Sequence, residues 1–235
     1  LQKRLSKAFD KIMLQSKVVE IKEEGEELVV KIENKDKQIE EHRFDYVLMS
    51  IGRKPQTAGL GLENTKVKVN ERGWIVADKS LKTDDDSIYA IGDIVGEPML
   101  AHKASHEARV AVDAISGKKA AFEPLAIPAV VFTDPEIAWA GITENQATER
   151  GIKFETAKFP WAASGRATTL DRSDGVTKII VDPDTERVLG IGISGPGAGE
   201  LIAEATLAIE MGATIKDLAL TIHPHPTLSE TVMEA

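Results

Sequence analysis

The pattern of apolar residues changes near residues 120–126 and divides the chain into two blocks. Before this point, nearly continuous apolar runs lie at 44–50 and 87–91, as expected of strands that are buried on both faces. After residue 124, helical and strand patterns come in blocks, with neighbouring strands joined by short turns. We therefore expect a chain that is α/β in its first part and α+β in its second.

The first block also carries helical and hairpin patterns. A helix over 101–116, ended by Gly117, is expected to bury one apolar face. That face carries Ala104, Ala108, Val112 and Ile115. The other elements expected here are a helix over 1–13, a hairpin of strands at 18–21 and 28–32, and a short strand at 73–76.

The apolar pattern of the second block predicts several short strands and three helices. Thr143 is placed to cap the first of these helices, and a polar turn at 182–187 joins the last two strands into a hairpin. The expected strands are 127–132, 137–141, 153–159, 177–181 and 188–194, and the expected helices are 143–150, 199–211 and 215–220.

Composition excludes several classes of function. The chain has 29 basic and 38 acidic residues and a net charge of −9, so it lacks the basic surface of a protein that binds nucleic acid or an anionic membrane. No apolar stretch reaches the roughly 18 residues that a membrane-spanning helix needs. Cysteine is absent, which excludes disulfides, thiolate zinc sites and cysteine nucleophiles within these residues.

The segment 190–195, Gly-Ile-Gly-Ile-Ser-Gly, matches the dinucleotide fingerprint G-x-G-x-x-G and precedes a helix. However, its strand is joined to strand 177–181 by a tight turn, which makes a hairpin and not the parallel βαβ unit that binds dinucleotides. The first two glycines also alternate within the strand. We therefore interpret these glycines as small residues that allow close packing between sheet and helix.

An acidic residue, Asp93, follows Gly92 at the end of the second apolar run. A carboxylate at the carboxyl end of a buried strand lies where α/β proteins bind ligands, and it can accept hydrogen bonds from sugar or polyol hydroxyls. The helix that follows offers free N–H groups that favour an anion. A turn-capping aspartate is the competing interpretation, but the helix start at 99–102 makes a ligand site the more specific one.

Near the end of the chain, His225 stands between two prolines and Glu230 follows five residues later. A carboxylate can fix the tautomer of an imidazole and raise its basicity, which suits acid–base chemistry near neutral pH. Alternatively, Thr227 and Glu230 form a capping box at a helix start. The flanking prolines restrict the backbone around His225 and favour the catalytic interpretation.

The other histidines are less informative. His223 and His225 are two residues apart with no third ligand near in sequence, so a metal site is not expected. We expect His42 to be a solvated surface residue, and His106 to be a packing or surface residue on its helix.

Three segments taken together resemble a known family. The string TDDDSIYAIGDIVGEPMLAHKASHEARVA, the segment FPWAASGRA at 159–167 and the terminal HPHPTLSE are similar to the dihydrolipoamide dehydrogenases, which belong to the disulfide flavoprotein reductases. The resemblance covers the whole chain and is closest to the bacterial type. Glutathione and trypanothione reductases share a His-Pro-Thr…Glu ending but lack the second His-Pro before it, and mercuric reductases lack this ending.

The resemblance implies a role for each matching residue. Asp93 corresponds to the acid that binds the ribityl chain of FAD, and Gly52 to the end of the NAD domain that touches the nicotinamide nucleotide. His225 corresponds to the base that deprotonates dihydrolipoamide, oriented by Glu230 and acting in the flavin site of the other subunit of a homodimer. The backbone that meets the pyrimidine edge of the flavin corresponds to Met99, Leu100, Ala101 and His102.

The resemblance also implies three parts. Residues 1–60 are expected to be a remnant of a nucleotide-binding domain, here the C-terminal part of the NAD-binding domain. Residues 61–123 are expected to be a central FAD-contacting segment. Residues 124–235 are expected to be an α+β dimerisation (interface) domain that makes the homodimer.

The implied activity is oxidation of protein-bound dihydrolipoamide with NAD⁺, through FAD and a redox disulfide. The implied partners are the lipoyl domains of 2-oxoacid dehydrogenase complexes, in the cytoplasm. The family's FAD phosphate loop and Cys-x4-Cys disulfide are not among these residues, so we expect the second half of a longer polypeptide, inactive alone. Two alternatives stay open: a dimerisation and histidine-donor module without bound flavin, and a related disulfide reductase such as a glutathione-reductase-like enzyme.

Overall fold

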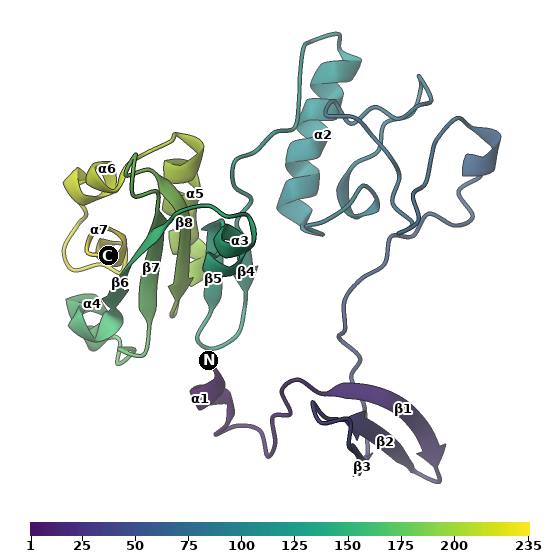
Figure 1. Cartoon of the computed structure of the whole chain (residues 1–235), viewed down its shortest axis with the longest axis horizontal. Helices are drawn as coiled ribbons and strands as arrows, with labels where there is room; N and C mark the ends of the chain where they lie inside the picture. The colour runs from purple at the N-terminus through teal and green to yellow at the C-terminus, as the bar shows by residue number, and fades with distance from the viewer. The chain divides into compact units, whose positions relative to one another are not determined.

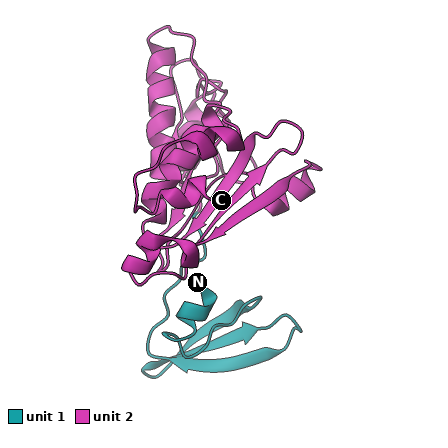
Figure 2. Cartoon of the chain, turned by 90° about the vertical axis from the view of Figure 1, so that its left-hand side faces the viewer, with its two compact units in different colours: residues 1–53 teal, residues 54–235 magenta.

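The computed structural model describes residues 1–235 as two compact units, residues 1–53 and residues 54–235 (Figure 2). No helix in either unit is long and apolar enough to cross a membrane.

Unit 1 is a small antiparallel sheet in the order β1-β2-β3, preceded by the short helix α1 (Gln2–Leu5) (Figure 1). Strands β1 (Lys17–Glu24) and β2 (Glu27–Glu33) form the expected hairpin, and Gly25 supplies the left-handed turn with φ of +69°. Strand β3 (Ile39–Phe44) completes the sheet.

Two expectations for unit 1 are wrong. The helix expected over 1–13 ends at Leu5, because the apolar side chains of Phe9 and Leu14 are exposed and a short helix is stable mainly through tertiary packing. The strand expected at 44–50 is also absent: β3 ends at Phe44, and the chain then continues without a strand partner. An apolar run becomes a buried strand only between neighbouring strands, and here Tyr46, Leu48 and Ile51 are exposed.

The first part of unit 2 is mostly irregular. It holds two 3₁₀ turns, η1 (Leu62–Asn64) and η2 (Gly92–Ile94), and the helix α2 (Ala101–Ile115). The strands expected at 73–76 and 87–91 are reduced to isolated bridges. At the second site, Thr83 and Ala90 make the backbone hydrogen bonds of a hairpin that is too short to count as strands.

Helix α2 has the expected length but buries a different face. Its buried residues are Lys103, Glu107 and Ala111, whereas Val112 and Ile115 are largely exposed. The apolar periodicity therefore misidentified the inner face. An ion pair between Lys103 and Glu107 allows these two charged residues to be buried there.

The second part of unit 2 is the expected α+β fold. A five-stranded antiparallel sheet runs in the order β4-β5-β8-β7-β6, and helices pack beside it (Figure 1). Its strands are β4 (Ala129–Val131), β5 (Ile137–Gly141), β6 (Glu155–Pro160), β7 (Val176–Val181) and β8 (Val188–Ser194). Its helical elements are α3 (Glu144–Glu149), η3 (Trp161–Ala163), α4 (Gly165–Thr169), α5 (Ala198–Glu210), α6 (Ile215–Leu220) and α7 (Glu230–Met233).

Local signals placed several of these elements correctly. Strand β5 and helix α6 begin and end where the sequence predicted. Thr143 caps α3 as expected, and it does so in a capping box with Gln146. The hairpin of β7 and β8 is confirmed.

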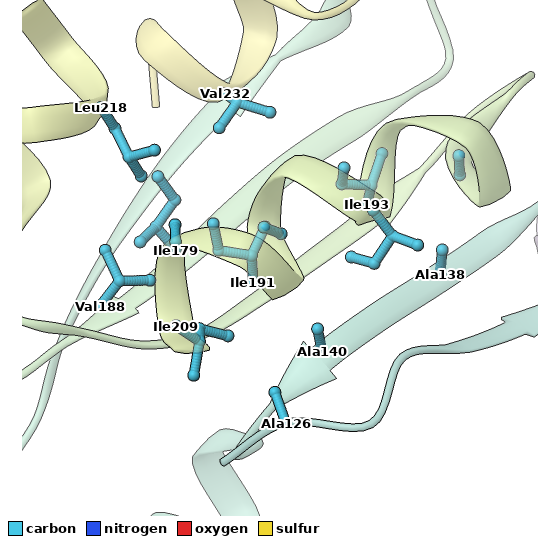
Figure 3. Close-up of a cluster of buried hydrophobic side chains, with 14 of the residues drawn as sticks. Ala126, Ala138, Ala140, Ile179, Val188, Ile191, Ile193, Ile209, Leu218 and Val232 are labelled. Carbon is cyan, nitrogen blue, oxygen red and sulfur yellow. The ribbon is translucent and has the colours of Figure 1, made fainter. Parts of the chain in front are cut away.

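The main hydrophobic core lies between the sheet and helix α5 (Figure 3). Strand β5 contributes only small side chains, Ala138 and Ala140, while Ile191 and Ile193 of β8 are fully buried. Small residues on β5 let α5 lie close to the sheet, so that Ile209 reaches the same core.

The interpretation of the glycines at 190–195 as residues that allow close packing between sheet and helix is only partly correct. Gly190 approaches the backbone after β5 and Gly195 approaches Trp161 of η3, whereas nothing lies within 4 Å of the Cβ position of Gly192. A Cβ atom at Gly190 would lie 2.1 Å from the carbonyl oxygen of Ile142, and one at Gly195 would lie 2.2 Å from the ring of Trp161. Strand β8, which holds the first two glycines, pairs antiparallel with β7 and β5. This segment is therefore the middle of an antiparallel sheet and not a dinucleotide-binding turn.

Two glycines of this motif give a matched pair of variants. Gly190→Ala is expected to lower the free energy of unfolding by at least about 1–3 kcal/mol, because the new methyl group meets backbone that cannot move aside. Gly192→Ala is expected to be neutral or stabilising by about 0.5–1 kcal/mol, because nothing lies within 4 Å of its Cβ position. Urea unfolding followed by circular dichroism measures both. An equal loss in the two variants would contradict the packing interpretation.

Candidate functional site

The structure brings His225 and Glu230 together. The Nδ1 atom of His225 lies 2.8 Å from Oε1 of Glu230, although five residues separate them. The imidazole is 77% exposed and the carboxylate 20% exposed. An exposed imidazole ring on a shielded carboxylate is the arrangement of a base held in one orientation.

Glu230 also uses its second carboxylate oxygen. Oε2 accepts a hydrogen bond from the backbone N–H of Thr227 at 2.8 Å, which is the carboxylate half of the expected capping box. The other expected bond of the capping box, to the hydroxyl of Thr227, is not formed. This hydroxyl donates to the carbonyl oxygen of Pro224, and the N-cap of α7 is Ser229. The two interpretations of Glu230 are thus compatible, since one carboxylate serves both His225 and the backbone.

These hydrogen bonds hold the pKa of Glu230 below its ordinary value. The backbone N–H of Thr227 is the largest cause, and the hydrogen bond from His225 is the second. Glu230 is therefore ionised at neutral pH and can only accept hydrogen bonds. It follows that Nδ1 of His225 carries the hydrogen, and that Nε2 of the neutral ring holds the lone pair that can take up a proton.

A buried chain of hydroxyl groups fixes helix α7 to the sheet, and no sequence pattern predicted it. The indole N–H of Trp161 donates to the hydroxyl of Thr177 at 3.0 Å. Thr177 in turn bonds Thr231 at 2.8 Å, and Thr231 bonds the carbonyl oxygen of Leu228 at 2.7 Å. All three side chains are fully buried. The available signal was Trp161 itself, in the FPWAASGRA segment, but nothing in the sequence pairs it with the end of the chain.

The second candidate site is the turn at Gly92 together with the start of α2. Gly92 has φ of +80° and opens η2, which carries the half-buried Asp93. Leu100 is the N-cap of α2 and supplies no side-chain hydrogen bond, so the first N–H groups of this 15-residue helix are not capped by a side chain. The imidazole of His102 contacts the carbonyl oxygen of Pro128 at 2.7 Å.

An ion pair that is almost inaccessible to solvent joins these two parts, and no sequence signal indicated it. Nζ of Lys103 lies 2.7 Å from Oε1 of Glu107, with side chains 5% and 3% exposed. Oε2 of Glu107 accepts from the N–H of Gly92 at 2.6 Å, and Lys103 donates to the carbonyl oxygens of Gly92 and Gly96 at 3.3 Å each. The pair therefore holds the turn that carries Asp93 against α2.

The remaining singled-out residues lie apart from these clusters. Gly52 belongs to unit 1, is exposed and has φ of +122°. His42 was expected to be solvated but is half-buried, with Nε2 3.2 Å from Glu40 and its ring stacked on Phe44. His106 is exposed on α2. No group of three or more His, Asp or Glu side chains is arranged to hold a metal ion.

Two family models match the chain. Residues 1–108 match the model described as pyridine nucleotide-disulphide oxidoreductase. Residues 127–235 match the model described as the dimerisation domain of pyridine nucleotide-disulphide oxidoreductases. The gap between the two matches includes the segment at 120–126 where the apolar pattern changes.

Several curated relatives are named dihydrolipoyl dehydrogenase. A dihydrolipoyl dehydrogenase from Vibrio parahaemolyticus is 51% identical over 232 residues, which is 98% of this chain and 48% of that protein. One from Thermus scotoductus is 47% identical over 237 residues, covering all of this chain and 51% of that protein. The chain thus spans about half the length of the curated relatives it matches.

Two solved structures also match nearly all of this chain and about half of their own. LpdA from Mycobacterium tuberculosis is matched with a TM-score of 0.84 and 28% identity, over 94% of this chain and 47% of that one. The HOCl-induced flavoprotein disulfide reductase RclA from Escherichia coli is matched with a TM-score of 0.82 and 31% identity, over 93% of this chain and 49% of that one.

The buried pair on α2 can be compared with an exposed pair of the same spacing. Glu107→Gln is expected to lower the free energy of unfolding by about 3–5 kcal/mol, because it leaves the ammonium of Lys103 buried without a counter-charge. Asp86→Asn breaks the exposed pair with Lys82 and is expected to change the free energy of unfolding little, because solvent screens the two charges. Thermal and urea unfolding measure both, and similar losses would argue against the buried pair as a structural clamp.

Proposed function

Since this chain belongs to the pyridine nucleotide-disulphide oxidoreductase family, we propose that it forms part of a flavoenzyme that oxidises dihydrolipoyl groups and reduces NAD⁺. The relatives named dihydrolipoyl dehydrogenase support this choice of substrate. The geometry of His225 and Glu230 supports the chemistry. The substrate would be presented on lipoyl domains of 2-oxoacid dehydrogenase complexes, in the cytoplasm.

The pair of His225 and Glu230 is the observation that carries this proposal. In the proposed reaction, Nε2 of His225 takes the proton from a thiol of the dihydrolipoyl group, so that the sulfur becomes a thiolate nucleophile. Glu230 keeps Nδ1 protonated and stabilises the imidazolium that results. His225 later returns the proton to a thiolate, and the histidine ends as it began.

The turn at Gly92 and the start of α2 fit a flavin. The N–H groups at the start of α2 have no side-chain cap, and they favour the negative charge of a reduced flavin ring. In this proposal the pyrimidine edge meets Met99, Leu100, Ala101 and His102, Asp93 binds the ribityl chain, and Gly52 touches the nicotinamide nucleotide. FAD supplies the electron transfer between the thiols and NAD⁺ when it is bound.

We assign the parts of the chain accordingly. Residues 1–60 are the C-terminal part of an NAD-binding domain, 61–123 a central segment that contacts FAD, and 124–235 the dimerisation domain. The chain contains no cysteine, so the redox disulfide must be supplied by residues outside it. The chain alone is therefore expected to be inactive.

A second copy of the chain is proposed to cover an apolar surface beside the His225 segment. This surface, here called the α5 face, comprises Leu207 and Met211 of α5 and Leu220 and Ile222 at and after the end of α6, all largely exposed. The contact between His223 and Glu204 joins these two stretches of chain. The match of residues 127–235 to a dimerisation domain makes a second copy the proposed occupant. His225 would then act in the site of the other subunit.

The activity can be tested in a chimera. Residues 1–235 replace the matching half of the dihydrolipoyl dehydrogenase from Vibrio parahaemolyticus. The remaining half of that enzyme is to provide the redox disulfide, which this chain lacks. The chimera is expected to oxidise dihydrolipoamide with NAD⁺. His225→Gln in the chimera is expected to lower kcat by about 10²–10⁴-fold, because the proton acceptor is lost. Stopped-flow and steady-state absorbance at the NADH band measure the rates.

His42→Gln serves as the control for loss of a histidine, since His42 lies in unit 1 beside Glu40. It is expected to leave kcat unchanged. A chimera that binds flavin but has no turnover, or a His225→Gln variant with unchanged kcat, would refute the proposed role.

The α5 face makes a separate prediction about assembly. Leu207→Glu is expected to convert a dimer of the 235-residue chain into a monomer, because it places a charge in a desolvated contact. Ile39→Glu is the matched control, since Ile39 is a similarly exposed apolar residue of unit 1. Sedimentation velocity distinguishes the two states. A Leu207→Glu variant that is still dimeric would place the subunit contact elsewhere.

A further inference from the structure

The two histidines of the His-Pro-His-Pro segment lie in opposite environments. The side chain of His223 is only 5% exposed, and each ring nitrogen has a partner. Nδ1 lies 2.9 Å from the carbonyl oxygen of Thr221, and Nε2 lies 2.7 Å from Oε1 of Glu204 on α5. A carbonyl oxygen and a carboxylate oxygen are both hydrogen-bond acceptors, so each ring nitrogen of His223 faces an oxygen to which an imidazole N–H can donate.

The segment between α6 and α7 depends on such side-chain bonds. Residues 222–229 belong to no helix or strand. At the downstream end, Glu230 binds the backbone N–H of Thr227 and so ties the segment to α7. At the upstream end, the bond from His223 to Glu204 ties it to α5. His225 lies between these two attachments.

We propose that His223 and Glu204 form a second imidazole–carboxylate pair, which positions His225 by fixing its segment to helix α5. The reaction that His225 serves is taken from the proposed function. The existence of the pair of His223 and Glu204 does not depend on that function. Glu204 lies one helical turn from Leu207 of the α5 face. A base that acts in a partner's site must be placed relative to the subunit contact, and anchoring to α5 achieves this.

A metal-binding role for the two histidines is not supported. Nδ1 of His223 faces a carbonyl oxygen and Nε2 faces a carboxylate, so neither nitrogen points to an open coordination position. His225 uses Nδ1 for Glu230. His223 is therefore a positioning residue and is not a ligand.

Nuclear magnetic resonance of the 235-residue chain tests the pair directly. Long-range ¹H–¹⁵N correlations of the imidazole rings report which nitrogens are protonated. In the unaltered chain, neutral His225 is expected to carry its hydrogen on Nδ1. Glu204→Leu is expected to turn the single tautomer of His225 into a mixture. Glu204→Gln keeps a hydrogen-bonding partner for Nε2 of His223 and is expected to preserve the single tautomer of His225.

Kinetics of the chimera provide a second readout. Glu204→Leu is expected to lower kcat by about 10–100-fold through misplacement of His225, with the KM for NAD⁺ unchanged. Glu204→Gln is expected to retain most of kcat. Glu200→Leu is the control, because Glu200 is exposed on the same helix one turn away. It is expected to change neither the tautomer nor kcat.

The outcomes separate this inference from the proposed function. A folded Glu204→Leu chain in which His225 keeps its single tautomer would overturn the positioning role, and so would unchanged kcat in that chimera. If Glu204→Leu lowers the unfolding midpoint too far for study, Glu204→Gln decides: loss of its tautomer or of its turnover would equally overturn the inference. If the unaltered chimera shows no turnover, the proposed function fails, and the tautomer measurement still tests the pair.

Discussion

The close approach of helix α5 and Trp161 to the antiparallel sheet supports the second part of unit 2, where the main hydrophobic core lies. Alanines on β5 leave room for the helix, and glycines at 175 and 195 leave room for the indole, where a Cβ atom would come within 2.4 Å and 2.2 Å of it. The buried Trp161 then donates its N–H to Thr177, which begins the hydroxyl chain that reaches α7. The glycines therefore let Trp161 be buried, and the hydrogen bonds that start from Trp161 hold α7 and its first residue, Glu230, in place.

Carboxylates that bridge a side chain and the backbone recur in this molecule. Glu230 joins His225 to the N–H of Thr227. Glu107 joins Lys103 to the N–H of Gly92. In each case the two oxygens of one carboxylate have different partners, so the side chain cannot rotate without losing a hydrogen bond. In each case a carboxylate on a helix holds a nearby stretch of irregular backbone. Glu230 holds the segment that carries His225, and Glu107 holds the turn at Gly92.

The wrong predictions have a common physical cause. A run of apolar residues shows that side chains prefer burial, but it does not show what will cover them. Tyr46 and Leu48 lie in such a run and are exposed in unit 1, and Val112 of α2 is exposed in unit 2. Conversely, the buried face of α2 holds Lys103 and Glu107, which single-residue hydrophobicity assigns to the surface. Burial of a charge depends on its partner, and the partner is known only from the fold.

The sequence by itself determined the local elements and the choice of chemistry. Alternation and turn residues predicted the hairpin of β7 and β8, and a proline-flanked histidine five residues before a glutamate predicted the pair of His225 and Glu230. The residues that make up each of these signals lie close together in the sequence, so the signals can be recognised without the fold. Only the tertiary structure decided that Glu204 on α5 meets His223, since 19 residues separate them and no local rule joins the two. Contacts of that range depend on how helices pack on a sheet, which the linear pattern does not encode.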